Sequence, residues 1–221
     1  MPRAEPGGYD QIVQRLVHLT RYRNIQQLEN SDEESPLAGK LKLIPVGTQR
    51  DFVKGDKPNP QPLTGSEPYE VQAGDWLFLK IANRSSYDIN VVAIDLAPDW
   101  SITQVSPGKL GPAFWTLDGN TERQVQIKSS LPAGCDHGTD LIKVIATLGP
   151  ANFRWLELPA LGVSDAEAAG LRGVPKNPLE QLFSRLSTTA PATRNLEVAE
   201  YASEKWATAQ VELRIHRASH R

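Results

Sequence analysis

The sequence has almost no cysteine to form disulfides, and it has no long apolar run that could anchor it in a membrane. Its 221 residues include a single cysteine, Cys135, so no disulfide can form within the chain and a reducing compartment is favoured. No apolar run approaches the ~18 residues of a membrane-spanning helix. The first residues, MPRAEPGGYDQ, lack the basic and apolar regions of a signal peptide. Together these absences predict a cytoplasmic protein.

The chain also has no large excess of positive or negative charge, with 24 Lys and Arg against 26 Asp and Glu. The formal net charge is −2, so the chain as a whole has no strong electrostatic attraction to nucleic acid or to an anionic membrane. Neither of the Gly-rich phosphate-binding patterns, GxxxxGK(S/T) and GxGxxG, occurs in it. We therefore expect no nucleic-acid or membrane partner and no cofactor.

Proline and glycine, by contrast, are frequent. The 17 prolines and 16 glycines lie mostly between apolar runs, which is typical of many short strands with irregular connections. With 39% hydrophobic and 23% charged residues the composition is that of a soluble globular protein. This length suits one all-β domain with helical additions.

Two apolar runs organise the predicted sheet. Trp76 to Ile81 and Val91 to Leu96 are separated by a polar break, Asn83 to Asn90. The pattern predicts two neighbouring antiparallel strands joined by a hairpin loop. The first strand is apolar on both faces, which predicts a central strand covered on both sides. A third apolar run, Leu141 to Leu148, is expected beside this pair.

The N-terminal part of the chain has helical periodicity. From Tyr9 to about Leu28, one apolar stripe recurs at helical spacing and is formed by Ile12, Val13, Leu16, Val17 and Leu19. The helix is expected either to pack on the flank of the domain or to be a linker that carries an upstream domain. A long polar loop with few apolar residues is expected from Gly47 to Pro68.

The remaining patterns complete a mainly β fold. A helix is predicted from Pro178 to about Leu186, inside a helical insertion at about 164–187. Residues 131–139 are expected to form a loop. Further strands are predicted at 41–46, 101–105, 113–117, 123–128, 153–158 and 205–216. The best fit is an antiparallel two-sheet β-sandwich, Ig-like, with a linker and flanking helix at 1–30 and the sandwich domain at 31–221.

Cys135 and His137 are the one thiol and imidazole that lie close in sequence. A reactive dyad needs the imidazole to accept the thiol proton, and no third orienting group is identifiable. A metal site fails for want of further ligands. Aspartates near strand ends can gather calcium, but aspartate also favours turns. The residues therefore predict no catalytic group and no metal site.

The five tryptophans are more informative. Trp76 and Trp155 lie in predicted strands and are expected in the core, and Trp206 begins the last strand. Trp100 and Trp115 lie next to turns. Each can stack on a sugar or a peptide, or can cap the core, so these two are the candidate binding residues.

Several segments resemble a region C-terminal to the protease domain of cyanobacterial caspase-like proteins, the orthocaspases related to metacaspases. The segments are 21–29 (RYRNIQQLE), 37–43 (LAGKLKL), 69–106 and 138–161 (GTDLIKVIATLGPANFRWLELPAL). They also include a pattern common to bacterial β-sandwich modules, here Gly74-Asp75, Tyr87, Val91 to Leu96 and Pro107-Gly108. A caspase-like catalytic domain would bring a His-Gly pair and, later in the chain, a Cys. Here Cys135 precedes His137, so no catalytic residue carries over.

The resemblance implies a non-catalytic accessory or regulatory domain. Its partner would be a caspase-like protease domain, in cis or in trans, or another protein. Two alternatives remain: a carbohydrate- or peptide-binding sandwich that uses Trp100 and Trp115, and a free-standing hydrolase that uses Cys135 and His137.

Overall fold

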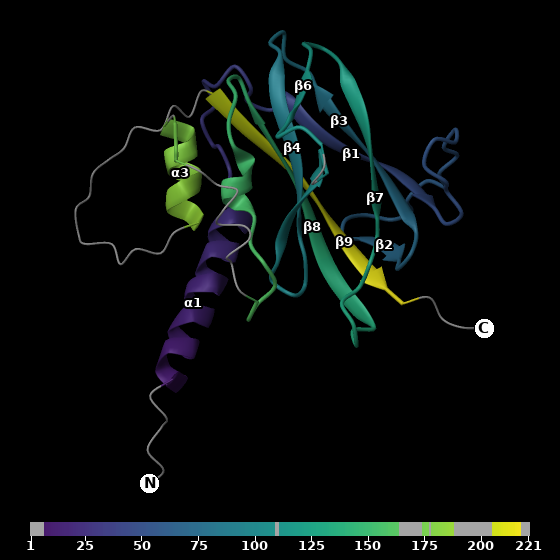
Figure 1. Cartoon of the computed structure of the whole chain (residues 1–221). Coiled ribbons are helices and arrows are strands. Elements are labelled where there is room, and N and C mark those ends of the chain that lie inside the picture. Colours follow the sequence, from purple (N-terminus) through teal and green to yellow (C-terminus); the bar gives the residue numbers. More distant parts are fainter. Residues whose placement is uncertain (1–6, 109–110, 164–173, 177, 188–204, 218–221) are drawn as a thin grey trace.

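The computed structural model describes residues 7–108, 111–163, 174–176, 178–187 and 205–217, which form nine strands, two α-helices and one 3₁₀-helix (Figure 1). The helices are α1 (Gly7–Gln26), η1 (Phe153–Leu156, 3₁₀) and α3 (Pro178–Ser187). The strands are β1 (Leu41–Gln49), β2 (Tyr69–Gln72), β3 (Trp76–Asn83), β4 (Ile89–Leu96), β5 (Ile102–Ser106), β6 (Trp115–Leu117), β7 (Glu122–Lys128), β8 (His137–Thr147) and β9 (Trp206–His216).

Two sheets of unequal size make the sandwich. The smaller has the order β1-β3-β7, and the larger has the order β2-β9-β8-β4-β5 with β6 paired to the start of β4. Every strand pair is antiparallel except β2 with β9, which is parallel. The predicted two-sheet sandwich, with one helix before it and one before its last strand, is confirmed. Within the predicted insertion, α3 is the described helix, and residues 164–173 lie outside the described residues.

The larger sheet is buried on both faces at its centre, along β4 and most of β8, whereas the outer face of β9 is exposed at Gln210, Glu212 and Arg214. Its inner face packs on the smaller sheet through residues such as Val91, Ala93 and Val144. Its outer face, which carries Ile94 and Leu96, is covered by α1, η1 and α3. Side chains therefore alternate between two faces along β4, and each face packs in a separate core.

The predicted hairpin between the first two apolar runs is wrong. β3 lies in the smaller sheet between β1 and β7, whereas β4 lies in the larger sheet between β8 and β5. The polar break therefore carries the chain from one sheet to the other. The prediction that Leu141 to Leu148 lies beside the organising strands holds for β4, which β8 pairs along its whole length.

A buried amide fixes this crossing. Asn83 is fully buried, and its Nδ2 donates to the carbonyl oxygens of Tyr87, Leu117 and Asp118 at 2.7, 3.2 and 3.0 Å. Its Oδ1 accepts from the backbone N–H and the hydroxyl of Ser85 at 3.0 and 2.7 Å. Because every polar atom of the amide is used, the bend after β3 has one stable geometry.

β3 is covered on both sides, as its two apolar faces predicted. Leu77 and Leu79 face the larger sheet, and Phe78 lies on the opposite face. Phe52, from the long polar loop, covers that opposite face and contacts Trp76 and Phe78 edge-on, with ring centroids 5.5 and 5.0 Å apart. The loop is thus fixed to the sheet by one buried aromatic side chain.

Three smaller predictions need correction. β8 begins at His137, inside the segment expected to be a loop. Residues 153–156 form η1 in place of a strand, because Asn152 caps the segment by accepting from the backbone N–H of Arg154. β2, only four residues long, was not predicted.

We expect Asn83→Ala to lower the free energy of unfolding by about 3 kcal/mol, because it removes five hydrogen bonds from a buried position and leaves the Leu117 carbonyl and the Ser85 N–H without the amide. The control is Asn90→Ala: the Asn90 side chain accepts one exposed hydrogen bond from Thr116. That variant should cost less than about 1 kcal/mol. Urea unfolding of both variants measures the difference, and equal losses would contradict the role given to Asn83.

Candidate functional site

The structure does not bring Cys135 and His137 into a hydrogen-bonded dyad. Among the described residues, the contacts of Cys135 are made by its backbone: its N–H donates to Pro132, and its carbonyl accepts from Arg217. His137 is exposed and pairs with His216 at the start of β8. In the described part of the chain, no group of three or more His, Cys, Asp or Glu side chains is placed to hold a metal ion.

The two candidate binding tryptophans lie at opposite ends of β4. Trp115 pairs with Val91 near the start of the strand, whereas Trp100 follows its end. The guanidinium of Arg123 covers the Trp115 ring at 3.8 Å from its centroid, so one face of that ring is already occupied. Trp100 remains 41% exposed and contacts Tyr22 edge-on. The two rings do not form one stacking platform.

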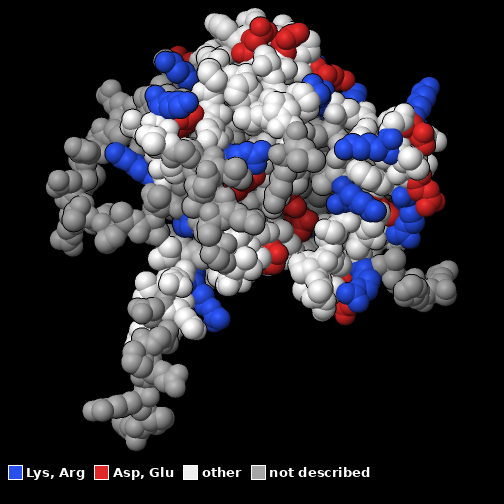
Figure 2. Space-filling model, in the orientation of Figure 1, with Lys and Arg blue, Asp and Glu red and all other residues white. Residues whose placement is uncertain are grey.

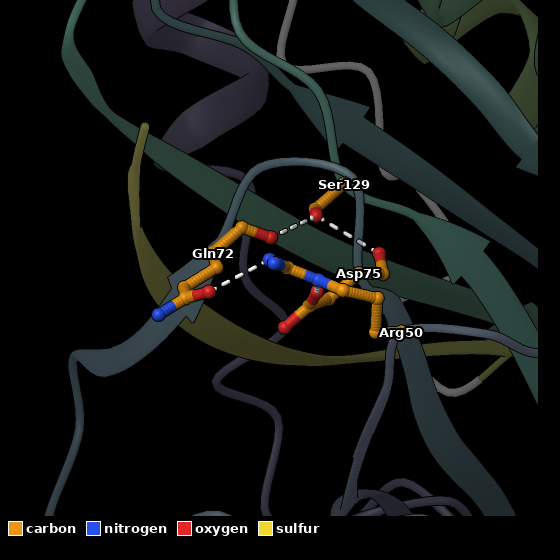
Figure 3. Close-up of polar contacts among 4 residues, drawn as sticks. All are labelled: Arg50, Gln72, Asp75 and Ser129. Atoms are coloured by element: carbon orange, nitrogen blue, oxygen red, sulfur yellow. Dashed lines mark hydrogen bonds and ion pairs between the residues drawn. The ribbon is translucent and has the colours of Figure 1, made fainter. Parts of the chain in front are cut away.

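A polar cleft of about 650 Å³ lies where β1 ends beside β2 and the turn into β3. Arg50 donates to Asp75 and to Gln72, both at 2.7 Å (Figure 3). Ser129 donates to the carbonyls of Gln72 and Asp75 at 2.7 and 2.9 Å. These four residues therefore satisfy one another's hydrogen-bonding groups. Their contacts connect the loop after β1 to the β2–β3 turn.

Two carboxyls, one buried and one half-buried, lie on the inner face of the larger sheet. Asp95 of β4 is paired with Ile142 of β8, so Asp140, two residues before Ile142, lies diagonally opposite Asp95. Burial, and then the charge of Asp99, raises the pKa of Asp95 to about 7. Burial, followed by the charges of Asp95 and Asp99, raises the pKa of Asp140 to about 8. The fold therefore favours the neutral form of both groups.

Lys143 anchors the end of α1. This side chain of β8 is fully buried on the outer face of the larger sheet, and its Nζ donates to the carbonyls of Ile25, Gln26 and Leu28 at 3.2, 2.6 and 2.9 Å. Carbonyls at a helix C-terminus have no partner within the helix and carry partial negative charge, so an ammonium is well matched to them. Burial lowers the pKa of Lys143 to about 8, so the group is still mainly protonated at pH 7.

The C-terminal half of α1 packs on the domain. Tyr22, Ile25 and, just beyond the helix, Leu28 are buried in the outer core. The hydroxyl of Tyr22 donates to the Ala97 carbonyl at 3.3 Å, and His18 Nε2 lies 2.9 Å from the Trp100 carbonyl oxygen. The flank-packing prediction holds for this half of the helix.

The N-terminal half of α1 exposes an apolar stripe. Tyr9, Ile12, Val13 and Leu16 are 68, 57, 57 and 59% exposed, and they follow the i, i+3, i+4, i+7 spacing of one helix face. At 100° per residue this face points roughly 160° away from Tyr22 and Ile25. These four residues are called the α1 stripe below.

The stripe lies where α1 extends beyond the sandwich (Figure 1). On the visible side the described part of this projecting helix carries mostly uncharged side chains (Figure 2). The five residues of the predicted apolar stripe therefore differ in burial: Ile12, Val13 and Leu16 are exposed, whereas Val17 and Leu19 are half-buried. No helix of the described residues is long and apolar enough to cross a membrane.

Sequence reasoning missed Lys143, although a signal was present. A single lysine in the apolar run LIKVIAT has to find acceptors for its ammonium, since a buried charge without them is costly. The exposure of the α1 stripe had no comparable signal, because periodicity shows that a face is apolar but not what covers it.

No family model matches the chain, and no curated protein matches it either.

The two raised pKa values predict how stability depends on pH. A carboxyl whose pKa is higher in the folded state binds its proton more tightly there, so its contribution is complete below about pH 4 and is lost as the pH rises through 7 to 8. We expect the free energy of unfolding to fall across this window. Asp140→Asn should flatten the fall and stabilise the protein at pH 8 by about 1–3 kcal/mol, since it removes a buried charge. Urea unfolding at pH 4, 6 and 8 tests this; an unchanged pH profile would contradict it.

Lys143→Met should loosen α1 selectively. The substitution keeps an unbranched apolar chain but removes the donor from the carbonyls of Gln26 and Leu28, and leaves Ile25 with the Leu28 N–H alone. Amide hydrogen exchange in the C-terminal half of α1 should therefore become at least about 10-fold faster relative to β8. Lys42→Met, at an exposed position of β1, is the matched control. Unchanged exchange in α1 would show that Lys143 is not its anchor.

Proposed function

We propose that this chain is a non-catalytic recognition module, a β-sandwich that presents α1 to a partner protein. The observation that carries the proposal is the α1 stripe: four large apolar side chains, each more than half exposed, on one face of a helix that extends past the sheets. Exposed apolar side chains that share one face mark an interaction surface more often than scattered ones do.

The shape and charge of the stripe define the partner. An amphipathic helix with anchors at i, i+3, i+4 and i+7 fits a hydrophobic groove on another protein. Arg23 is exposed and, seven residues after Leu16, lies on the same face of the helix as the stripe. The matching groove is therefore apolar along its floor and carries carboxylates at its rim.

The anchored end of α1 supports this role. Lys143 and Tyr22 hold the C-terminal half of the helix to the larger sheet, so the projecting half keeps a defined direction. A preordered helix loses less conformational entropy on binding than a segment that folds as it binds.

The companion that the sequence resemblance implies is a caspase-like cysteine protease, in cis or in trans. On this proposal the sandwich recognises a partner or substrate for that protease, or restrains it, and performs no hydrolysis itself. Neither Cys135 nor His137 enters the argument, because they do not form a dyad.

Leu16→Glu should weaken binding to a catalytically inactive caspase-like protease domain from the source organism at least about 10-fold, because it places a charge in the middle of the apolar contact. Val53→Glu makes the same change at another exposed apolar residue, 63% exposed and far along the chain in the long loop, and should leave binding unchanged. Titration calorimetry with the purified proteins measures both.

Three results would contradict the proposal. The first is equal binding by wild type and Leu16→Glu, and the second is an equal loss of binding in Val53→Glu. The third is peptidase activity of the chain alone that Cys135→Ala abolishes, which would make it an enzyme.

A further inference from the structure

Most sheet edges of the described chain are protected against pairing with another strand. The outer side of β5 bonds the backbone of Leu158 through Ile102, at 2.8 and 3.0 Å. The outer side of β1 is interrupted by an irregularity between Pro45 and Gly47 and bonds Gln61 through Thr48. β2 is only four residues long. Covered, bulged, short or proline-bearing edges are the usual devices that prevent strand addition.

β7 has none of these four devices, and the charged side chains that it carries, Glu122, Arg123 and Lys128, are of both signs. It is seven residues long, contains no proline, and pairs with β3 without a register shift. It is the last strand of the smaller sheet, and no described residue pairs with its outer side.

The hydrogen bonds at the two ends of the β3–β7 pair show which residues face outward. Asn83 donates to Thr121, and Ser129 donates to Asp75, both at 2.9 Å. Bonded and non-bonded pairs alternate in an antiparallel ladder, so the odd-numbered residues of β7 bond to β3. The N–H and C=O groups that point away from the sheet are those of Glu122, Gln124, Gln126 and Lys128.

These outward residues are self-complementary. In an antiparallel copy centred on Val125, Glu122 lies opposite Lys128 of the partner subunit, and Gln124 lies opposite Gln126 of the partner subunit. In this register each residue whose backbone N–H and C=O point outward lies opposite another such residue. About eight backbone hydrogen bonds can therefore form between the two copies. We propose that β7 pairs with β7 of a second copy, which joins two three-stranded sheets into one across a two-fold axis.

The charged residues of β7 support pairing with a second copy of the chain. Glu122 already accepts from Lys80 at 2.7 Å and lies 3.4 Å from Arg84, but a carboxylate has room for further donors. Because the two copies are related by a two-fold axis, the pair between Glu122 and Lys128 of the partner subunit occurs twice. The net charge of −2 per chain adds little repulsion between copies. The contact is small for a dimer interface, which predicts weak, concentration-dependent association.

Sedimentation equilibrium of the full chain from ~1 µM to ~1 mM, a range that spans weak association, tests the proposal. Wild type should pass from monomer to dimer. Glu122→Lys and Lys128→Glu should each weaken the dimer about 10-fold, because each places like charges opposite one another twice. The double variant restores both pairs between the copies but leaves the new lysine beside Lys80 and Arg84 of its own chain, so it should recover part of the loss and associate more tightly than either single variant.

Gln126→Pro is an independent probe, because its N–H points outward and is not needed by β3; it should abolish the dimer. A wild-type chain that stays monomeric at the highest concentration overturns the proposal. So does a dimer that ignores both the charge exchange and the proline, or one that is lost only in Leu16→Glu, which would place the contact at the α1 stripe. These outcomes do not depend on the partner proposed for α1.

Discussion

The buried amide of Asn83 determines how the chain is divided between the two sheets. Three carbonyls from two separate segments, Tyr87 and the Leu117–Asp118 pair, converge on one side-chain nitrogen. A tight hairpin after β3 would leave this amide without those partners, and a buried unpaired amide is costly. The crossing is therefore the conformation in which the Asn83 amide finds its hydrogen-bond partners, and it places β3 and β4 in different layers.

The rest of the architecture depends on that division. Because β4 joins β8 and β9, the larger sheet has an outer face of its own, and α1 packs there with its last turn bonded to Lys143. The sheet ends before the helix does, so the first half of α1 is left with an exposed apolar face. Because β3 takes β7 as its other neighbour, β7 becomes the open edge of the smaller sheet. Both proposed interaction surfaces thus follow from the same crossing.

Local pattern was sufficient to predict that several elements exist and where they lie along the chain. The alternation in β4, β7 and β9 and the start signal of α3 all predicted elements that the structure contains. The polar break between β3 and β4 was ambiguous, since its length and composition fit a hairpin or a crossing, and the choice depends on Leu117 and Asp118, more than 30 residues away along the chain. Phe52 was equally hidden, because one aromatic in a polar loop does not indicate which surface it covers. The candidate site followed the same rule: the α1 stripe was visible as a periodicity, but its exposure depends on where the sheet ends.

Backbone Hα–Hα NOEs test the crossing most directly, because such contacts connect only paired strands, whereas side-chain contacts also bridge the two layers. The account predicts an Hα–Hα contact between Phe78 and Gln126, which pair in the β3–β7 ladder, and a set of contacts along β4 and β8. It predicts none between β3 and β4. A run of Hα–Hα contacts joining Trp76–Asn83 to Ile89–Leu96 would show that the two strands form a hairpin, and would contradict the division of the chain on which both proposed surfaces rest.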